Sequence, residues 1–385
     1  MTPPRRQALA LLLGLAAGFA GAVLAGRHAA AASAPAHFTR FTPFLSAEAS
    51  YFPPFAEMEH LALARWHPGQ TVVIIGGNSI LNGVGQPAGE LWSGHLQTLL
   101  GDRYVVVNLS FRGGQPAEGG ALVAESLLRR GVPVLLVDNT APGPVGRAYE
   151  NVYGYLFWQA RDRGRLLPHE PRDLDLAARA ELLGPAGRIR RAEERLGARL
   201  DVFLNFQALW EHVAGRYFST VWTRFLPLDF WRPREALPDP EPAPAPLAGR
   251  FASGLEVEMA IVRGFSAAMG TPDGAGGWRV DDGWIRAAAR DLDAVFPDAL
   301  RPRMLMLLSQ NCPYYRDRLT PAERDRDTAV FAAYEQMWRR NGIRCVTAGA
   351  SFTAADYRDR THLAPSGGEK LAGLVAAELR RLDLP

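Results

Sequence analysis

Cysteine is almost absent from this chain of 385 residues, which contains only Cys312 and Cys345. This excludes the class of small secreted domains in which several disulfides compensate for a small core. Lysine is also rare, because nearly all of the 43 Lys and Arg residues are arginines, and against 40 Asp and Glu they leave a net charge of +3. Such a small positive excess does not indicate a nucleic-acid-binding protein.

Motifs for nucleotides and metals are missing too. The glycine-rich stretch at 76–85 contains neither G-x-x-x-x-G-K-[ST] nor G-x-G-x-x-G, so no phosphate-binding or dinucleotide-binding loop is expected. Five histidines are scattered without the spacing of metal ligands, namely His60, His67, His95, His169 and His212. We therefore expect neither a cofactor nor a bound metal.

What the sequence does contain is a series of short apolar runs typical of buried parallel strands. The runs lie at 71–77, 104–110, 133–139 and 303–309, with a weaker fifth at 343–348. Segments with helical spacing separate the first three runs. This alternation predicts an α/β fold with three α/β/α layers and a parallel sheet of about five strands.

The two cysteines are expected to stay unpaired. Cys312 follows the fourth run and Cys345 lies early in the fifth, so in neighbouring parallel strands they would be offset by about six residues, roughly 20 Å. A disulfide requires Cα atoms within about 7 Å of each other.

The N-terminal residues 1–34 form an export segment, in which Arg5 and Arg6 precede an uncharged apolar run from Ala8 to Gly26. The run is close to the ~20 residues that span a bilayer, which favours an uncleaved anchor in the inner membrane. The small residues that follow would alternatively suit cleavage as a signal peptide, and a twin-arginine signal or a buried helix are further options. An anchor or a signal would place the rest of the chain in the periplasm or cell envelope.

Between the third and fourth runs the alternation of strands and helices stops. We expect one domain in two parts, 35–140 and 301–385, with a helical insertion at 141–300. The insertion includes a proline-rich connector, RPREALPDPEPAPAPLAG, which must be extended or irregular. Its many aromatic residues fit two alternatives: contact with a membrane or partner, or filling of the insertion's own small core.

One serine stands where open parallel sheets bind their ligands, beyond the carboxyl ends of the strands. Ser79 follows the first run directly after Gly76, Gly77 and Asn78. A serine there is placed to act as a nucleophile, although such serines also serve as helix caps or turn residues.

A second group lies near the C-terminus, where Asp359 and His362 stand three residues apart before a final helical segment. A nucleophilic serine needs a base to accept its proton, and the base needs a carboxylate to orient it. Asp359 and His362 would supply both, whereas such a pair taken alone is more often a surface salt bridge.

Taken in order along the chain, these blocks resemble those of the SGNH/GDSL hydrolase superfamily. The first block, usually Gly-Asp-Ser, is matched by Gly77, Asn78 and Ser79, with Asn in place of Asp. The second, an Asn followed five residues later by Gly, is matched by Asn108 and Gly113.

The third and the last block match the pattern of this superfamily to different degrees. The third, Gly-x-Asn-Asp, is reduced to residues 137–140, of which only Asn139 matches. The last block is matched fully by Asp359 and His362. The resemblance covers roughly residues 70–140 and 303–385 and leaves the insertion outside it.

The resemblance implies a flavodoxin-like SGNH fold and a catalytic triad. Ser79 would be the nucleophile, His362 the general base and then acid, and Asp359 the orienting carboxylate. The main-chain amides of Ser79 and Gly113 and the side-chain amide of Asn139 would bind the oxyanion.

The expected function is that of an exported serine esterase that cleaves ester bonds through an acyl-enzyme. The alternative is an O-acyltransferase, for acetyl or a similar group, that modifies a cell-envelope glycan. The N-terminal anchor and large insertion resemble the layout of SGNH-like proteins that work with a membrane-bound acyltransferase partner. A second alternative is a non-catalytic glycan-binding member, because the third block is weakened. In each case the expected ligand is an ester or an acylated glycan.

Overall fold

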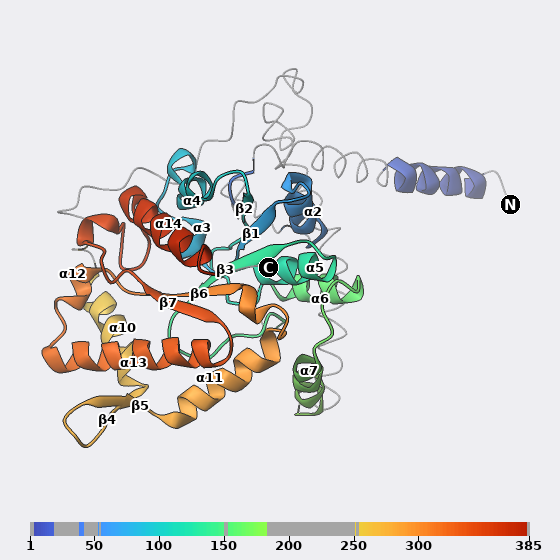
Figure 1. Cartoon of the computed structure of the whole chain (residues 1–385). Helices are drawn as coiled ribbons and strands as arrows, with labels where there is room; N and C mark the ends of the chain where they lie inside the picture. The colour runs from blue at the N-terminus through green and yellow to red at the C-terminus, as the bar shows by residue number, and fades with distance from the viewer. Residues whose placement is uncertain are drawn as a thin grey trace. The chain divides into compact units, whose positions relative to one another are not determined.

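Five parallel strands form the central sheet of the computed structural model, which describes residues 4–18, 38–41, 53, 55–149, 153–182, 251 and 254–382. The sheet order is β2-β1-β3-β6-β7, and every neighbouring pair is parallel (Figure 1). The strands are β1 (Thr71–Ile75), β2 (Tyr104–Asn108), β3 (Val134–Thr140), β6 (Met304–Ser309) and β7 (Arg344–Ala348). Each predicted run is one of these strands, and their order is that of flavodoxin-like sheets. The predicted α/β fold class is confirmed.

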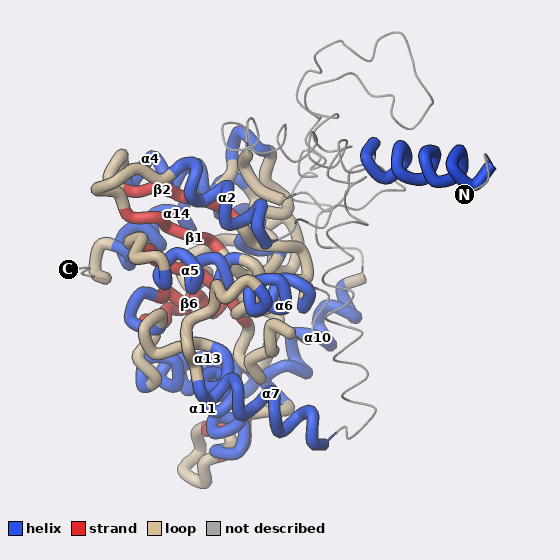
Figure 2. Tube along the Cα trace, turned by 90° about the vertical axis from the view of Figure 1, so that its right-hand side faces the viewer, coloured by secondary structure: helices blue, strands red, loops and turns tan. Residues whose placement is uncertain are grey.

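Helices cover both faces of the sheet and complete the three α/β/α layers. One face packs against α4 (Trp92–Leu100) and α14 (Pro365–Leu379). The other packs against α5 (Gly120–Arg129) and α13 (Pro321–Arg340), as Figure 2 shows from the side. The strands are therefore buried on both faces, which is why they consist of nearly continuous apolar residues.

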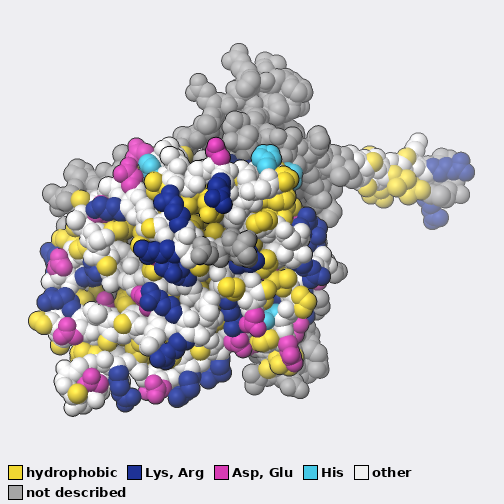
Figure 3. Space-filling view, in the orientation of Figure 1, with side chains coloured by type: hydrophobic (Ala, Val, Ile, Leu, Met, Phe, Trp, Pro, Cys, Tyr) yellow, Lys and Arg dark blue, Asp and Glu magenta, His cyan; other side chains and the backbone are white. Residues whose placement is uncertain are grey.

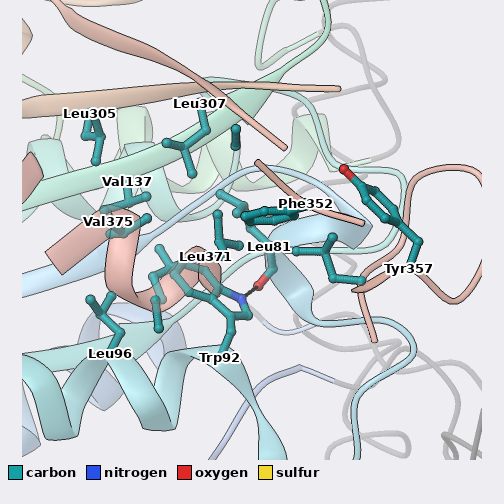
Figure 4. Packing of buried hydrophobic residues seen from close by; sticks show 14 of the residues in the cluster. Leu81, Trp92, Leu96, Val137, Leu305, Leu307, Phe352, Tyr357, Leu371 and Val375 are labelled. Atoms are coloured by element: carbon teal, nitrogen blue, oxygen red, sulfur yellow. Dashed lines mark hydrogen bonds between the residues drawn. The ribbon is translucent and has the colours of Figure 1, made fainter. Parts of the chain in front are cut away.

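The core beneath α4 and α14 also holds the short helix α3 (Ser79–Asn82), which follows β1. Val137 of β3 and Val375 of α14 lie in this core (Figure 4). Trp92 is fully buried, and its indole N–H donates to the main-chain oxygen of Leu81 at 2.7 Å. Because a buried indole without a partner is costly, this bond fixes α3 against the start of α4.

The described part of the insertion is helical, as predicted, and comprises α6 (Gly154–Asp162), α7 (Glu170–Leu182), α10 (Leu255–Ala267) and α11 (Asp282–Val295). It also contains an antiparallel hairpin, β4 (Gly270–Pro272) and β5 (Trp278–Val280), that the helical spacing did not predict. Asp273 Oδ1 closes the hairpin turn by accepting the N–H groups of Ala275 and Gly277, both at 2.8 Å. The proline-rich connector lies outside the described residues, and so do residues 203–225, which carry the aromatic side chains considered above.

Both cysteines are buried and unpaired. Cys345 of β7 lies opposite Met306 of β6, six residues before Cys312. The expected offset, and with it the absence of a disulfide, is confirmed. The remaining elements are α2 (Phe55–Arg65), α12 (Pro313–Arg316) and the 3-10 helices η1 (Ala88–Glu90), η2 (Arg301–Arg303) and η3 (Ala354–Asp356).

Charge on the surface is mixed. On the face shown in Figure 3, Lys and Arg side chains lie among apolar and uncharged ones, and acidic side chains are scattered between them. A mixed surface of this kind agrees with a net charge of only +3.

The chain divides into two units, one of residues 1–38, 42–65 and 200–238 and one of residues 39–41, 66–199 and 239–385. The second unit contains the central sheet. In the first, residues 4–18 form an exposed helix, and Arg65 at the end of α2 donates to the main-chain oxygen of Phe38.

Among the described residues, no helix is both long and apolar enough to cross a membrane. The apolar run from Ala8 to Gly26 lies only partly within the described part of the chain. A membrane anchor and a cleavable signal peptide both stay predictions.

Candidate active site

Three side chains that are distant in sequence form one hydrogen-bonded chain beyond the carboxyl ends of the strands. His362 Nε2 lies 2.8 Å from Ser79 Oγ, and His362 Nδ1 lies 2.6 Å from Asp359 Oδ2. With the Nδ1 hydrogen donated to Asp359, Nε2 carries the lone pair that accepts the hydroxyl proton of Ser79. The structure thus brings together the three residues predicted as a triad, in the geometry of a nucleophile, its base and an orienting carboxylate.

The loop that carries Asp359 and His362 holds both of them in place. Asp359 Oδ1 accepts the N–H groups of Thr361 at 2.9 Å and His362 at 2.8 Å, and the N–H of Arg358 donates to His362 O at 2.8 Å. Burial alone would raise the pKa of Asp359, but the hydrogen bond and positive charge of His362 and the two main-chain donors outweigh it and lower the pKa to about 2. Asp359 is therefore a carboxylate at neutral pH.

A buried carboxylate, Asp356, ties the base of this loop to the first turns of α14. Its oxygens accept the N–H of Thr353 at 2.7 Å, the hydroxyl of Ser366 at 3.0 Å and the ammonium of Lys370 at 2.6 Å. Lys370 is the only lysine of the chain. Asp356 and Lys370 were not predicted as site residues, although the T-x-x-D spacing from Thr353 is a helix-capping signal that could have indicated Asp356.

Ser79 is presented by a tight turn from β1 into α3. Asn78 caps α3, because its Oδ1 accepts the N–H of Ile80 at 3.0 Å, and Gly83 ends the helix in the left-handed conformation. Asn78 Oδ1 also accepts a hydrogen from Asn139 Nδ2 at 2.9 Å. An Asp at this position would accept the same two bonds, so the Asn that replaces it keeps the acceptor while removing a charge.

Asn139, a residue of β3, holds the turn before Ser79 through two hydrogen bonds to Asn78. Its Oδ1 accepts the N–H of Asn78 at 3.0 Å, while one hydrogen of its Nδ2 goes to Asn78 Oδ1. The other contact of Nδ2 is a long one, 3.4 Å to Ser309 Oγ at the end of β6. This second hydrogen therefore has only a weak partner among the described residues and is the one that a ligand can engage. Ser309 was not predicted as a site residue, since a single serine at a strand end carries no distinguishing signal.

The loop after β2 brings Gly113 to the same edge of the sheet. The N–H of Phe111 donates to Gly77 O at 3.1 Å, and a Cβ added to Gly114 would lie 2.6 Å from that oxygen. The loop therefore needs glycine at 114 to approach the turn before Ser79. Within the described residues, neither the Ser79 nor the Gly113 main-chain N–H donates a hydrogen bond, so both stay available to a ligand.

Asn108, the first residue of the second block, has a structural role. Its Nδ2 donates to Leu81 O at 3.0 Å, and its Oδ1 accepts the hydroxyl of Ser110. It joins the end of β2 to α3. Among the described residues, no group of three or more His, Cys, Asp or Glu is arranged to hold a metal ion.

Comparison with known proteins adds little to this site. No protein-family model and no curated protein matches the chain. One solved structure is similar at 14% sequence identity and a TM-score of 0.31, over 81% of this chain and 98% of the other. A likeness of this degree indicates neither a family nor a function.

Proposed function

We propose that this protein is a serine hydrolase of the SGNH type that cleaves ester bonds through an acyl-enzyme, outside the cytoplasm. The observation that carries the proposal is the chain of hydrogen bonds from Ser79 through His362 to Asp359. It is supported by the free N–H groups of Ser79 and Gly113 beside it, because a nucleophile and donors for an oxyanion are the two requirements of acyl transfer.

In the acylation step, Ser79 Oγ attacks the carbonyl carbon of the ester while its proton passes to His362 Nε2. The Asp359 carboxylate stabilises the imidazolium that forms. The negative charge on the carbonyl oxygen is met by the N–H groups of Ser79 and Gly113 and by the second hydrogen of Asn139 Nδ2. The imidazolium then donates its proton to the departing alcohol oxygen, which leaves the acyl group on Ser79.

Deacylation repeats these roles with a second nucleophile. Water gives its proton to His362 Nε2 and attacks the acyl carbon, and collapse of the intermediate returns the proton to Ser79 Oγ. The hydroxyl of a glycan could replace water without any change in the residues used. Hydrolysis and transfer therefore differ only in the acceptor.

The test uses the full-length chain in mild detergent with p-nitrophenyl acetate, and follows both the initial burst and the steady rate. Ser79→Ala is compared with wild type, and Ser351→Ala, at an exposed serine, is the matched control. We expect sustained turnover in wild type and in the control, and its loss in Ser79→Ala. Equal rates in wild type and Ser79→Ala would refute the proposal. A burst of one equivalent without turnover would instead indicate transfer to an acceptor other than water.

A further inference from the structure

A second carboxyl group, Asp138, lies under the proposed site and takes no part in the triad. Asp138 is the residue of β3 before Asn139, and its side chain is fully buried. Its Oδ1 accepts the N–H of Asn139 at 2.8 Å. Its Oδ2 has no hydrogen-bond partner among the described residues.

Two parts of the site meet on this carboxyl, the turn before Ser79 and Asn139. A Cβ added to Gly76 would lie 2.9 Å from Asp138 Oδ2, and one added to Gly77 would lie 2.8 Å from Oδ1, so the chain leading to Ser79 runs directly over it.

We propose, on the basis of the function proposed above, that Asp138 is a positioning residue whose buried carboxyl fixes the turn before Ser79 and Asn139 relative to one another. It touches no reacting atom. It acts through the main chain of the groups that would carry the nucleophile and the oxyanion donors.

The environment of Asp138 favours the neutral form. Burial raises the pKa of Asp138 to about 8, against the opposing effect of the hydrogen bond from the N–H of Asn139, and the negative charge of Glu118 adds to the rise. Glu118, on the loop before α5, is the ionisable group that acts on Asp138 within the described part of the chain. Gly76 and Gly77, which follow β1, lie against the carboxyl, and its neighbour on β6 is Met306.

Ionisation of Asp138 would have two effects on catalysis. It would bury a negative charge that only the N–H of Asn139 is seen to meet among the described residues, and so strain the turn before Ser79 and Asn139. It would also place a negative charge under the developing oxyanion and so oppose its formation. Both effects act on the transition state. We therefore expect kcat to fall as pH rises through about 8, with little change in KM.

The test is the pH profile of kcat and KM between about pH 6 and pH 10, with Ser79→Ala as the blank for hydrolysis by hydroxide. Asp138→Asn keeps the shape and the acceptor oxygen but cannot ionise, and Asp102→Asn, at an exposed aspartate, is the matched control. In wild type and in the control we expect a fall of about tenfold per pH unit above the midpoint, and in Asp138→Asn no such fall.

If Asp138→Asn does not fold, the same prediction is tested on wild type alone. Infrared difference spectra are then recorded between neutral and alkaline pH. The band of a neutral carboxyl must then disappear with the same midpoint as kcat. An alkaline fall that is the same in Asp138→Asn, or the absence of such a band, would overturn the role of Asp138 while leaving the esterase proposal intact. Absence of turnover dependent on Ser79 in wild type would overturn both.

Discussion

His362 Nδ1 lies 2.6 Å from Asp359 Oδ2, and the other oxygen of that carboxylate is held by the N–H groups of Thr361 and His362. The base and its carboxylate are therefore assembled within four consecutive residues, from contacts that the loop makes with itself. Of the three triad residues, only Ser79 has to be supplied by another part of the chain.

Asp359→Asn is expected to lower kcat on the order of 10³- to 10⁴-fold, because an amide can donate to Nδ1 and so stabilise the wrong tautomer of His362. Asp359→Glu should retain more activity, since it keeps the charge. Asp325→Asn, at an exposed aspartate of α13, is the matched control and should be neutral. Steady-state kinetics with an aryl ester measures the effect. A loss of less than about tenfold in Asp359→Asn would be incompatible with the assigned role.

The lowered pKa of Asp359 also predicts a dependence of stability on pH. Its folded value of about 2 lies below the ordinary value of 3.8, so its contribution is complete above pH 3.8 and is lost as pH falls towards 2. The free energy of unfolding of wild type minus that of Asp359→Asn should therefore decrease over this range. Urea unfolding of the two proteins at several acidic pH values measures the difference. A constant difference would mean that the carboxylate is not stabilised in the fold.

Asn139→Ala is expected to lower kcat on the order of 10²- to 10³-fold, since it removes a side-chain donor to the oxyanion. Ser309→Ala should cost much less, because the hydroxyl only contacts Asn139 Nδ2 at 3.4 Å. KM should change little in either variant, and Ser351→Ala again serves as the control. If Ser309→Ala were the more damaging of the two, the serine rather than the amide would be the group that meets the oxyanion.

Gly114→Ala tests the close approach of the two loops. The added Cβ would lie 2.6 Å from Gly77 O, a main-chain atom that cannot move without shifting the turn before Ser79. We expect a destabilisation of about 1–3 kcal/mol and a fall in kcat that exceeds any change in KM. Gly89→Ala is the matched control, because an added Cβ there meets nothing within 4 Å. Thermal unfolding and kinetics of the same preparations separate the two effects, and a fully active Gly114→Ala would contradict the contact.

Lys370→Met is expected to destabilise the fold by about 1–3 kcal/mol, because it leaves the buried Asp356 without its cation. Lys370 is half exposed, so the loss should be smaller than for a fully buried ion pair. Urea unfolding measures the change, with Arg290→Met on the exposed side of α11 as the control. Equal stabilities of wild type and Lys370→Met would show that Ser366 and Thr353 alone hold the loop.

The strands could be predicted from the sequence because a parallel strand buried on both faces is a short, nearly continuous apolar run. β4 and β5 could not, because strands of three residues carry no periodicity and their turn depends on one side chain, Asp273. Ser79, Asp359 and His362 could be predicted because their order along the chain resembles that of a known family.

Other parts of the site have no such signal. Asp356 and Lys370 are separated by fourteen residues, and only the packing of the loop on α14 brings them together. Asp138 lies near the end of an apolar run. At such a position the sequence alone does not distinguish a buried carboxyl from one that lies beyond the strand and is exposed to solvent. Its burial depends on the glycines of another strand end, Gly76 and Gly77.

Ser79 and His362 are 283 residues apart in sequence. A chain still being synthesised, and complete only as far as β6, would contain the nucleophile and both oxyanion loops but no base. Its serine hydroxyl would be an ordinary, weakly nucleophilic alcohol. Because contacts of such long range form late in folding, the chemical reactivity of Ser79 reports completion of the whole domain. If the proposed function is correct, the order of the polypeptide itself therefore prevents acyl transfer by a partly folded chain.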